Sequence, residues 1–493
     1  MIVGYRVFEG VPIRELHGTM PEFFRELTSD SREVQPGDLF VSLRGGTFDG
    51  HEFLTQATER GAIAAIVDHP CASSIATQIV VDDTLATLPR IAANFYGHPA
   101  RDLHIIGITG SNGKTTSAYL LETILKSFGL ETAVIGTIEY RFGDRHIDAS
   151  NTTPLPHDLQ RLLRQIVDCD IHHLVMEVSS HGLALHRVDE IRFGVALFTN
   201  LSQDHLDFHK TMDDYRETKK RLFTDHLTED GIIVLNLDDE TGRRYAEELQ
   251  GHRILTFAID RDADFRARDI EMRLTGNSFT LETRNGDRIP FHTPLIGRHN
   301  IANILGSIAA AWAAGVSLEA IRIGIDTMQA VPGRLESIPN GIDSQIVVDY
   351  CHTPDALEKC LHTLNAIPHK RIITLFGCGG DRDRGKRPLM GSIALRLSDQ
   401  VIVTSDNPRT EDPLEIIKEI EAGMTEGKDR YVVIPDRREA IRFGIDKILQ
   451  GDIFLLAGKG HETYQILGRK KTPFDDRVIA REFLFEAGKG AQE

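Results

Sequence analysis

A glycine-rich segment at residues 107–116 carries the strongest chemical signal in the sequence. It reads GITGSNGKTT, with an apolar run before it and a helical pattern, SAYLLETILKSF, after it. Glycines let backbone N–H groups close around phosphate oxygens, and a helix N-terminus adds positive potential. Lys114 would reach the terminal phosphates of a nucleotide, and the Thr115 hydroxyl would bind Mg²⁺. The alternative is a plain glycine-rich turn, because Ile108 stands where the strict phosphate-loop pattern has glycine.

Three further segments could hold a metal ion or an anion near such a phosphate. Glu177 in MEVSSHG follows a predicted strand, and its carboxylate suits Mg²⁺, which takes oxygen ligands. His205 lies in NLSQDHLDFH, where two histidines and two aspartates crowd six residues. Lys219 lies in the helical pattern YRETKKRLF. The ordinary alternatives are an exposed glutamate, a solvated turn and a basic helix surface, and spacing alone favours the last for Lys219.

Polar turns near the far end of the chain could bind an anion or an amino acid. Arg334 in PGRLE lies on a tight turn, and Asp349 in DYCHTPD ends a predicted strand. The run Asp406-Asn407-Pro408-Arg409 offers a carboxylate, an amide and a guanidinium, which complement the ammonium and carboxylate of an amino acid. The alternatives are a salt bridge between domains, a helix cap and an Asx-Pro turn with a surface arginine.

The elements that must position these residues form three blocks. Short strand-like runs fill residues 1–100, and residues 101–330 alternate apolar strands with helical patterns, which predicts a mostly parallel sheet. Residues 331–493 repeat this alternation, with helices expected at 354–364 and 413–423. We therefore predict an α/β protein of three domains, in which loops after the carboxyl ends of the strands carry the site.

Composition narrows the class of protein. The 493 residues include 73 acidic and 56 basic ones, so the formal charge of −17 argues against a protein that coats nucleic acid or an anionic membrane. Five scattered cysteines favour free thiols in a reducing compartment. The first residues lack an apolar signal region, and the most apolar stretch, 301–316, is too short to span a bilayer. We expect a cytoplasmic, soluble protein.

The motifs, taken in order, resemble the Mur ligase family, ATP-dependent amide-bond ligases of bacterial cell-wall synthesis. The matching segments read GSNGKTT, NTTP, MEVSSHGL, NLSQDHLDFH, YRETK, GRHNIANI, PGRLE, DYCHTPDAL, GGDRDRGKRP, SDNPR and AGKGHE. They extend from residue 107 to 462, and DSR with PGDLF extends the resemblance to nearly the whole chain. The departure at Ile108 is similar to the loop that this family uses.

The resemblance implies a fold and a reaction. The fold is a small N-terminal α/β domain that binds a uridine nucleotide, a central ATPase-like parallel-sheet domain, and a C-terminal Rossmann-like domain. The reaction joins an amino acid to UDP-N-acetylmuramoyl-L-alanyl-D-glutamate, with ATP converting the D-glutamate carboxylate into an acyl phosphate that the amine attacks. It also implies a carbamylated Lys219 beside Mg²⁺, and a monomer that opens and closes about a hinge near residues 329–332.

The resemblance further implies roles for individual residues. For ATP these are Gly110, Ser111, Asn112, Gly113, Lys114, Thr115, Thr116, Asn303, Arg334 and Asp349. Near the metal they are Thr115, Glu177, His205 and Lys219, with Lys219, Lys114 and His205 as the catalytic set. For the muramoyl dipeptide they are Ser31, Asn151, Thr152, Thr153, Ser179 and Arg187, with the loop 46–48 also near the uridine nucleotide. For the incoming amino acid they are Arg382, Asp406, Asn407, Pro408, Arg409, Gly458 and Glu462.

The choice of amino acid follows from Arg409. The DNPR turn is similar to that of meso-diaminopimelate enzymes, whereas lysine enzymes carry an uncharged residue at this position. A guanidinium can bind the distal carboxylate of diaminopimelate with two parallel N–H bonds and repels the ammonium of lysine. Three alternatives stay open: the same ligation with L-lysine, a ligase like folylpolyglutamate synthetase, and a P-loop ATPase without ligation.

Overall fold

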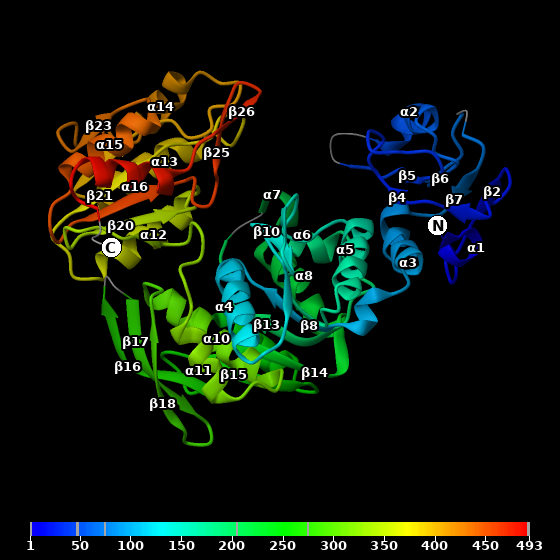
Figure 1. Ribbon diagram of the computed structural model, residues 1–493, viewed down its shortest axis with the longest axis horizontal. Coiled ribbons are helices and arrows are strands. Elements are labelled where there is room, and N and C mark those ends of the chain that lie inside the picture. Colours follow the sequence, from blue (N-terminus) through cyan, green and yellow to red (C-terminus); the bar gives the residue numbers. More distant parts are fainter. Residues whose placement is uncertain (1, 46–48, 73–74, 204–205, 274–275, 491–493) are drawn as a thin grey trace. The chain divides into compact units, whose positions relative to one another are not determined.

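The computed structural model describes residues 2–45, 49–72, 75–203, 206–273 and 276–490, and for 206 and 207 it describes the backbone only. His205 and the loop 46–48, both predicted to take part in the site, lie outside these ranges. The chain divides into two compact units. The first comprises residues 1–266, 283–285 and 302–324, and the second comprises 267–282, 286–301 and 325–493. Figure 1 labels their elements.

The N-terminal part of the first unit contains a five-stranded sheet in the order β2-β7-β6-β5-β4. Its strands are parallel except β2, which is antiparallel to β7. The bounds are β2 Glu15–His17, β4 Leu27–Thr28, β5 Leu39–Val41, β6 Ala64–Val67 and β7 Gln78–Val80, with a small ribbon of β1 Ile2–Val3 and β3 Phe23–Phe24. The helices are α1 Gly4–Val7, η1 Gly50–Phe53, α2 Leu54–Glu59, α3 Thr84–Tyr96 and η2 Pro99–Asp102.

A larger sheet follows in the order β11-β10-β9-β12-β8-β13-β14-β15-β16-β17-β18. The pairs from β9 to β16 are parallel, as the sequence predicts, and β10 and β11 add an antiparallel edge. The bounds are β8 His104–Thr109, β9 Thr132–Ile135, β10 Glu139–Phe142, β11 Arg145–Asp148, β12 His173–Glu177, β13 Phe193–Phe198, β14 Leu227–Asn236, β15 Arg253–Ala258 and β16 Phe265–Arg273. The helices are α4 Lys114–Ser127, α5 Pro156–Asp168, α6 Ser180–Ala184, α7 Leu206–His209, α8 Met212–Thr224, α9 Glu240–Glu248, α10 Arg298–Ala313 and α11 Leu318–Asp326.

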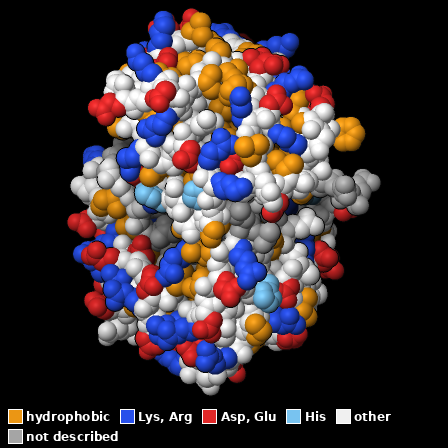
Figure 2. Space-filling model, turned by 90° about the vertical axis from the view of Figure 1, so that its left-hand side faces the viewer, with side chains coloured by type: hydrophobic (Ala, Val, Ile, Leu, Met, Phe, Trp, Pro, Cys, Tyr) orange, Lys and Arg blue, Asp and Glu red, His pale blue; other side chains and the backbone are white. Residues whose placement is uncertain are grey.

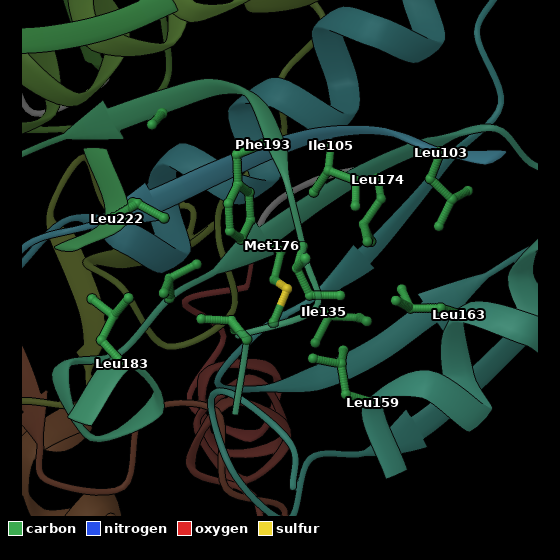
Figure 3. Packing of buried hydrophobic residues seen from close by; sticks show 14 of the residues in the cluster. Leu103, Ile105, Ile135, Leu159, Leu163, Leu174, Met176, Leu183, Phe193 and Leu222 are labelled. Atoms are coloured by element: carbon green, nitrogen blue, oxygen red, sulfur yellow. The ribbon is translucent and has the colours of Figure 1, made fainter. Parts of the chain in front are cut away.

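The core of this sheet forms because alternate strand residues point to one face. Ile105 of β8 and Leu174 and Met176 of β12 are buried with Leu159 and Leu163 of α5 (Figure 3). An apolar side chain buried in this way contributes about 1.5–3 kcal/mol. The packing fixes the carboxyl ends of β8 and β12, where Gly110 and Glu177 lie.

Most of the second unit is a doubly wound sheet in the order β19-β20-β24-β21-β22-β23, parallel except for β19. The bounds are β19 Glu336–Ile338, β20 Gln345–Asp349, β21 Ile372–Phe376, β22 Gln400–Val403, β23 Tyr431–Val433 and β24 Ile453–Ala457. The helices are α12 Pro354–Asn365, α13 Lys386–Leu397, α14 Pro413–Glu421, α15 Arg437–Lys447 and α16 Asp476–Glu486. The unit also holds β17 Gly276–Thr283, β18 Arg288–Thr293, and the ribbon of β25 Tyr464–Leu467 and β26 Lys470–Pro473.

Neighbouring residues on the strands of this sheet are buried on opposite faces. Ile372 and Leu455 pack with α12, α13 and α14, whereas Ile373 and Leu456 pack with α15 and α16. This is the α/β arrangement that the sequence predicts, here with helices on both faces of the sheet, and α12 and α14 lie within two residues of the expected bounds.

Charged side chains of both signs lie on the surface. Figure 2 shows Lys and Arg side chains interspersed with Asp and Glu over the face it presents. In the described part of the chain, no helix is long and apolar enough to cross a membrane. The five cysteines are free thiols.

Candidate functional site

The glycine-rich loop joins β8 to α4 as the sequence predicts. Gly110 and Gly113 have φ of +146° and +87°, and α4 begins at Lys114. Backbone and side-chain bonds tie the loop to the segment after β13: Ser111 N donates to Asn200 O at 2.8 Å, and Thr199 Oγ1 donates to Asn112 O at 2.6 Å. The loop is therefore preformed at the positive end of a helix, where a phosphate group is stabilised.

The Lys114 ammonium folds over this loop. Its Nζ donates to Gly110 O at 2.8 Å and to Ser111 O at 3.0 Å. Across the loop, a Cβ on Gly113 would lie 2.3 Å from Oδ1 of Asn303, which is buried on α10. The structure thus brings together residues 110–116 and Asn303 of the predicted ATP set.

We predict that Gly110→Ala lowers ATP affinity at least tenfold. Its new Cβ would lie 2.0 Å from Thr199 Oγ1, so the loop and the residue that anchors it must both move. The control is Gly129→Ala, because Gly129 has φ of +85° but nothing within 4 Å of the added carbon. Both positions have positive φ, and the added carbon clashes only at Gly110. Titration of each variant with ATP measures the effect, and equal affinities would contradict it.

Glu177 lies at the end of β12, fully buried, with its carboxylate facing the phosphate loop. Thr115 Oγ1 donates to Oε2 at 3.1 Å, Thr137 Oγ1 donates to Oε2 at 2.9 Å, and Thr137 N donates to Oε1 at 3.0 Å. Gly136 leaves room for this carboxylate, since a Cβ there would lie 2.4 Å from Oε1. A hydroxyl and a carboxylate at this spacing offer the oxygen donors that Mg²⁺ prefers. Sequence reasoning missed Thr137, whose position 40 residues from Glu177 gives no local signal.

Lys219 is 1% exposed and projects from α8 toward the phosphate loop. Its Nζ donates to Gly110 O at 3.1 Å and lies 4.5 Å from the ring centroid of Tyr215. The surface-helix alternative is therefore wrong: the lysine is buried beside the carbonyl that also accepts from Lys114.

The residues predicted to hold the muramoyl dipeptide converge behind Glu177. Thr153 Oγ1 donates to Glu177 O at 3.1 Å and accepts from Ser179 N at 3.0 Å. Arg187 Nη1 donates to Thr153 O at 2.7 Å, and burial lowers the pKa of this guanidinium. Asn151 and Thr152 precede this cluster, with Thr152 Oγ1 at 3.1 Å from Thr137 Oγ1. Ser31 lies apart from them, beyond β4, where its hydroxyl donates to Gln56 Oε1 at 2.6 Å.

Arg334 and Asp349 belong to the second unit and lie close together there. Asp349 ends β20, and its carboxylate accepts from the backbone N–H groups of Leu335 at 2.8 Å and Cys351 at 2.9 Å. The guanidinium carbon of Arg334 lies 5.3 Å from the ring centroid of Tyr350. The turn needs glycine at 333, which has φ of +64° and where a Cβ would meet His461 N at 2.1 Å.

The carboxyl edge of the second sheet gathers the predicted amino-acid set. Arg409, with φ of +52°, donates from Nη1 to Gly380 O at 2.9 Å. A Cβ on Gly379 would lie 2.9 Å from Arg409 Nη1 and 3.7 Å from Arg382 Cγ, so the two arginines flank this glycine. The loops after β21 and β22 thus bring the side chains of the two arginines to the same glycine.

A second polar group joins the same edge to the loop after β24. Asn407 Nδ2 donates to Glu462 Oε2 at 2.8 Å, and Lys459 Nζ donates to the same oxygen at 3.0 Å. Asp406 is buried with Oδ2 unpartnered, and a Cβ on Gly458 would lie 2.8 Å from that oxygen. Sequence reasoning missed Lys459, although this lysine lies in AGKGHE, one of the segments that match the family.

A buried arginine on α13 contacts both the loop after β21 and the loop after β22. Arg387 is fully buried, and its guanidinium donates to Glu411 at 2.8 and 2.9 Å, to Glu419 at 2.7 Å and to Gly379 O at 3.2 Å. The Arg387 charge lowers the pKa of Glu411 to about 2. Glu411 also accepts from Asp381 N at 2.5 Å. The loop carrying Arg382 and the loop carrying Arg409 therefore share one ionic anchor, which sequence reasoning did not assign.

Models of known protein families match three segments of this chain. Models of the Mur ligase middle domain, the Mur ligase glutamate ligase domain and the Mur ligase family catalytic domain match residues 108–311, 333–460 and 24–96. The chain belongs to the Mur ligase family. The family resemblance read from the motifs is thus confirmed, as are the α/β fold and ATP-dependent ligation as the class of activity.

Curated relatives of this Mur ligase cover almost its whole length. A UDP-N-acetylmuramoyl-L-alanyl-D-glutamate--2,6-diaminopimelate ligase of Geobacter metallireducens is 46% identical, with 97% of each chain covered. A protein of the same name from Clostridioides difficile is 41% identical, covering 97% of this chain and 98% of the relative. A solved structure of that name shares 33% identity at a TM-score of 0.70 over 99% of this Mur ligase.

Proposed function

We propose that this Mur ligase adds meso-2,6-diaminopimelate to UDP-N-acetylmuramoyl-L-alanyl-D-glutamate, at the expense of ATP, through an acyl phosphate. The product is a muramoyl tripeptide, a precursor of peptidoglycan. The observation that carries the choice of amino acid is the pair of arginine side chains that flank Gly379 at the carboxyl edge of the second sheet, next to Asn407, which bonds to Glu462. The relatives named for this reaction support it.

Residues of the first unit would bind ATP and the D-glutamate carboxylate that is to be phosphorylated. The phosphate loop and Lys114 would bind the triphosphate, and Asn303 would contact the base. Arg187, with the 151–153 segment and Ser179, would position the D-glutamate carboxylate, whose oxygen takes the γ-phosphoryl group while ADP leaves. Ser31 would contact the uridine nucleotide, and Arg334 and Asp349 of the second unit would bind the phosphate and ribose of ATP.

The residues around the phosphate loop fit a divalent cation. Thr115 Oγ1 and the Glu177 carboxylate lie 3.1 Å apart and are both oxygen donors. We propose that they hold Mg²⁺ together with His205, and that Lys219 acts as a carbamate, formed when its amine adds to CO₂. Bound Mg²⁺ would offset the repulsion between the carboxylate and the triphosphate. The role of Lys219 itself is to present an anionic group beside the Gly110 carbonyl.

Residues of the second unit would select the amine. Arg409 and Arg382 would bind the distal carboxylate of diaminopimelate, and Glu462 would accept from its distal ammonium. Asp406, Asn407, Pro408 and Gly458 would complete the pocket. Because the distal end of lysine is a lone ammonium, two guanidinium groups would repel it. The other amino group of diaminopimelate, which these residues do not bind, then attacks the acyl phosphate, and inorganic phosphate leaves.

We propose three domains with the bounds expected from the sequence, and each of the three family-model matches lies within one of them. Residues 1–100 would bind the uridine nucleotide, 101–330 would bind ATP, and 331–493 would bind the amino acid. We propose a cytoplasmic monomer whose domains close about a hinge at residues 329–332, as lids and domains do in many transferases. Five free thiols suit a reducing compartment.

Phosphate release tests the function. The purified protein is given ATP and Mg²⁺ with the muramoyl dipeptide and, in separate reactions, diaminopimelate or lysine. We expect release only when the dipeptide and diaminopimelate are both present. Equal turnover with lysine would refute the choice of amino acid. Release without any acceptor would indicate an ATPase, and release with a folate acceptor and glutamate would indicate a folylpolyglutamate-type ligase.

A further inference from the structure

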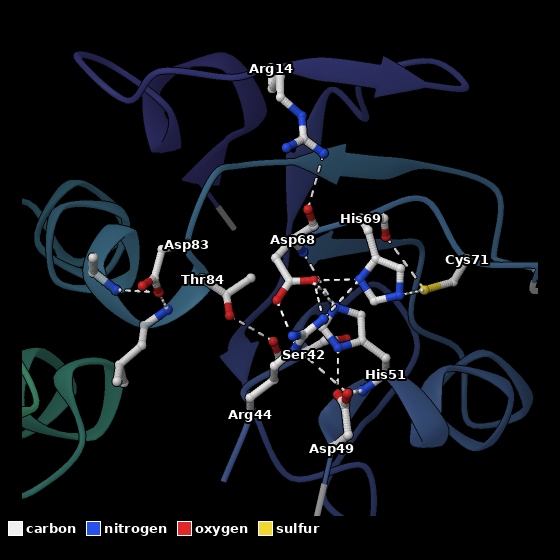
Figure 4. A network of polar contacts seen from close by, with 12 residues as sticks. Arg14, Ser42, Arg44, Asp49, His51, Asp68, His69, Cys71, Asp83 and Thr84 are labelled. Atoms are coloured by element: carbon white, nitrogen blue, oxygen red, sulfur yellow. Dashed lines mark hydrogen bonds and ion pairs between the residues drawn. The ribbon is translucent and has the colours of Figure 1, made fainter.

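A cluster of metal-ligating side chains lies in the N-terminal sheet, within the first unit but outside the set that the ligase reaction uses. His51 lies in η1, after β5, and His69 and Cys71 follow β6 (Figure 4). One ligand atom from each of the three can be chosen so that all lie within 4.8 Å of one another. Imidazole nitrogen and thiolate sulfur are the donors that Zn²⁺ takes in proteins, whereas Mg²⁺ takes oxygen.

Hydrogen bonds indicate the tautomer of each ring. His51 Nδ1 lies 2.5 Å from Asp49 Oδ1, and His69 Nδ1 contacts Asp68 Oδ1. A carboxylate only accepts, so each Nδ1 carries the proton and each Nε2 holds a lone pair. His51 Nε2 accepts a long bond of 3.3 Å from Asp68 N, which agrees with this tautomer. A carboxylate behind the far nitrogen is the usual arrangement of a metal-binding histidine.

The spacing of the donor atoms suits a tetrahedral ion. His69 Nε2 lies 3.6 Å from Cys71 Sγ. With Zn–N of about 2.0–2.1 Å and Zn–S of about 2.3 Å, two ligands at a tetrahedral angle stand about 3.6 Å apart. The ring of His51 packs against that of His69, with centroids 4.6 Å apart and planes 33° apart, and one ligand atom of each of the three residues lies within 4.8 Å of the others.

The local charge favours a cation. Asp49 and Asp68 both lie against the histidines of the cluster. Arg44 neutralises part of this negative charge, since its Nε lies 2.9 Å from Asp68 Oδ2 and its Nη2 lies 3.3 Å from His69 Nδ1. With Cys71 as thiolate, two carboxylates and one guanidinium leave a net charge of two negative units, which one divalent ion neutralises.

From this geometry we infer that His51 Nε2, His69 Nε2 and Cys71 Sγ bind one zinc-class divalent ion, with Asp49 and Asp68 orienting the two rings. The fourth position is open to water, as in zinc sites with three protein ligands. The ion would join the loop after β5 to the loop after β6. It is distinct from the oxygen site beside Thr115 and Glu177, and the inference does not depend on the ligase activity.

Cobalt and zinc binding to the full-length protein test the site. With Mg²⁺ at saturation, Co²⁺ should give a thiolate-to-cobalt charge-transfer band in the wild-type protein. A competition titration with a coloured chelator should find one tightly held Zn²⁺. Cys71→Ser should abolish the band and weaken Zn²⁺ binding at least 100-fold. Asp49→Asn should keep the band and weaken Zn²⁺ binding about 10–100-fold, the usual effect of losing a carboxylate behind a ligand histidine.

Two matched variants separate this site from other thiols and histidines. Cys169→Ser removes an exposed free thiol elsewhere, and His172→Ala removes an exposed histidine; neither should change the band or the affinity. His69→Ala, at a half-exposed position, should lose the tight Zn²⁺ and still unfold cooperatively. A wild-type protein without the charge-transfer band would overturn the inference, as would a band that survives in Cys71→Ser or disappears in Cys169→Ser.

Discussion

Replacing Lys219 by alanine should lower ligase turnover by about 10²–10³-fold, the scale expected when one preorganised charged group is lost from an active site. The Lys219 side chain is buried, and its amine lies 3.1 Å from the carbonyl of Gly110, which also accepts from Lys114. As a carbamate, this group would present an anion to the cation that the phosphate loop holds. Steady-state kinetics with all three substrates measures the loss.

Rescue and a neighbouring lysine make this prediction specific. Small carboxylates such as acetate should restore part of the Lys219→Ala activity, because they replace the missing anion. Lys220→Ala is the control: its amine pairs with Glu217 at 2.7 Å and Glu248 at 2.9 Å, and the variant should keep near-normal turnover. The circular dichroism and melting temperature of both variants report on folding. Full activity of Lys219→Ala would remove the carbamate role.

Arg409→Ala should weaken diaminopimelate binding by about 2–4 kcal/mol, the usual cost of truncating one partner of a desolvated charge pair. That corresponds to a rise in the KM for diaminopimelate of about 30- to 700-fold. The backbone contributes little to the difference, because arginine and alanine both meet the strain of φ at +52°. Lysine should become a better substrate at the same time, since one repulsive charge is gone.

An exposed arginine of the same unit is the matched control. Arg438 forms an ion pair with Glu482 at 2.6 Å on the surface, and such pairs are worth about 0–1 kcal/mol. Arg438→Ala should leave the KM for diaminopimelate and the preference over lysine unchanged. Unchanged kinetics in Arg409→Ala would show that this guanidinium does not read the distal carboxylate.

Local signals predict much of the fold and of the phosphate site. The strand, glycine loop, lysine and helix at residues 103–127 are adjacent in sequence, so pattern and spacing suffice to place them. The parallel strands and the helices of the second unit follow from apolar runs in the same way. Strands β16, β17 and β18 were not predicted, because the prediction relied on continuous apolar runs, whereas buried and exposed residues alternate along these strands.

Contacts between distant segments could not be read from the sequence. The burial of Lys219 depends on the packing of α8 against the loop after β8, and spacing alone pointed to a surface lysine. Thr137 and Lys459 become visible only when Glu177 and Glu462 are placed beside them. The family resemblance supplied a role for Asn303 that no local pattern gives, and it assigned Arg334, already a candidate for binding an anion, to ATP. His205, also named by the resemblance, lies outside the described residues.

The buried Arg387 separates the choice of amino acid from the scaffold that supports it. Removing both glutamates that it contacts would leave an uncompensated buried charge, which costs about 3–5 kcal/mol, so the pair of glutamates cannot be lost together. Arg409 bonds mainly to backbone carbonyls, and it can be exchanged without removing any of the contacts of Arg387 with these glutamates. Evolution could therefore change which amino acid is selected by substituting residues at the tip of the loop, while the Arg387 contacts at its base stay the same.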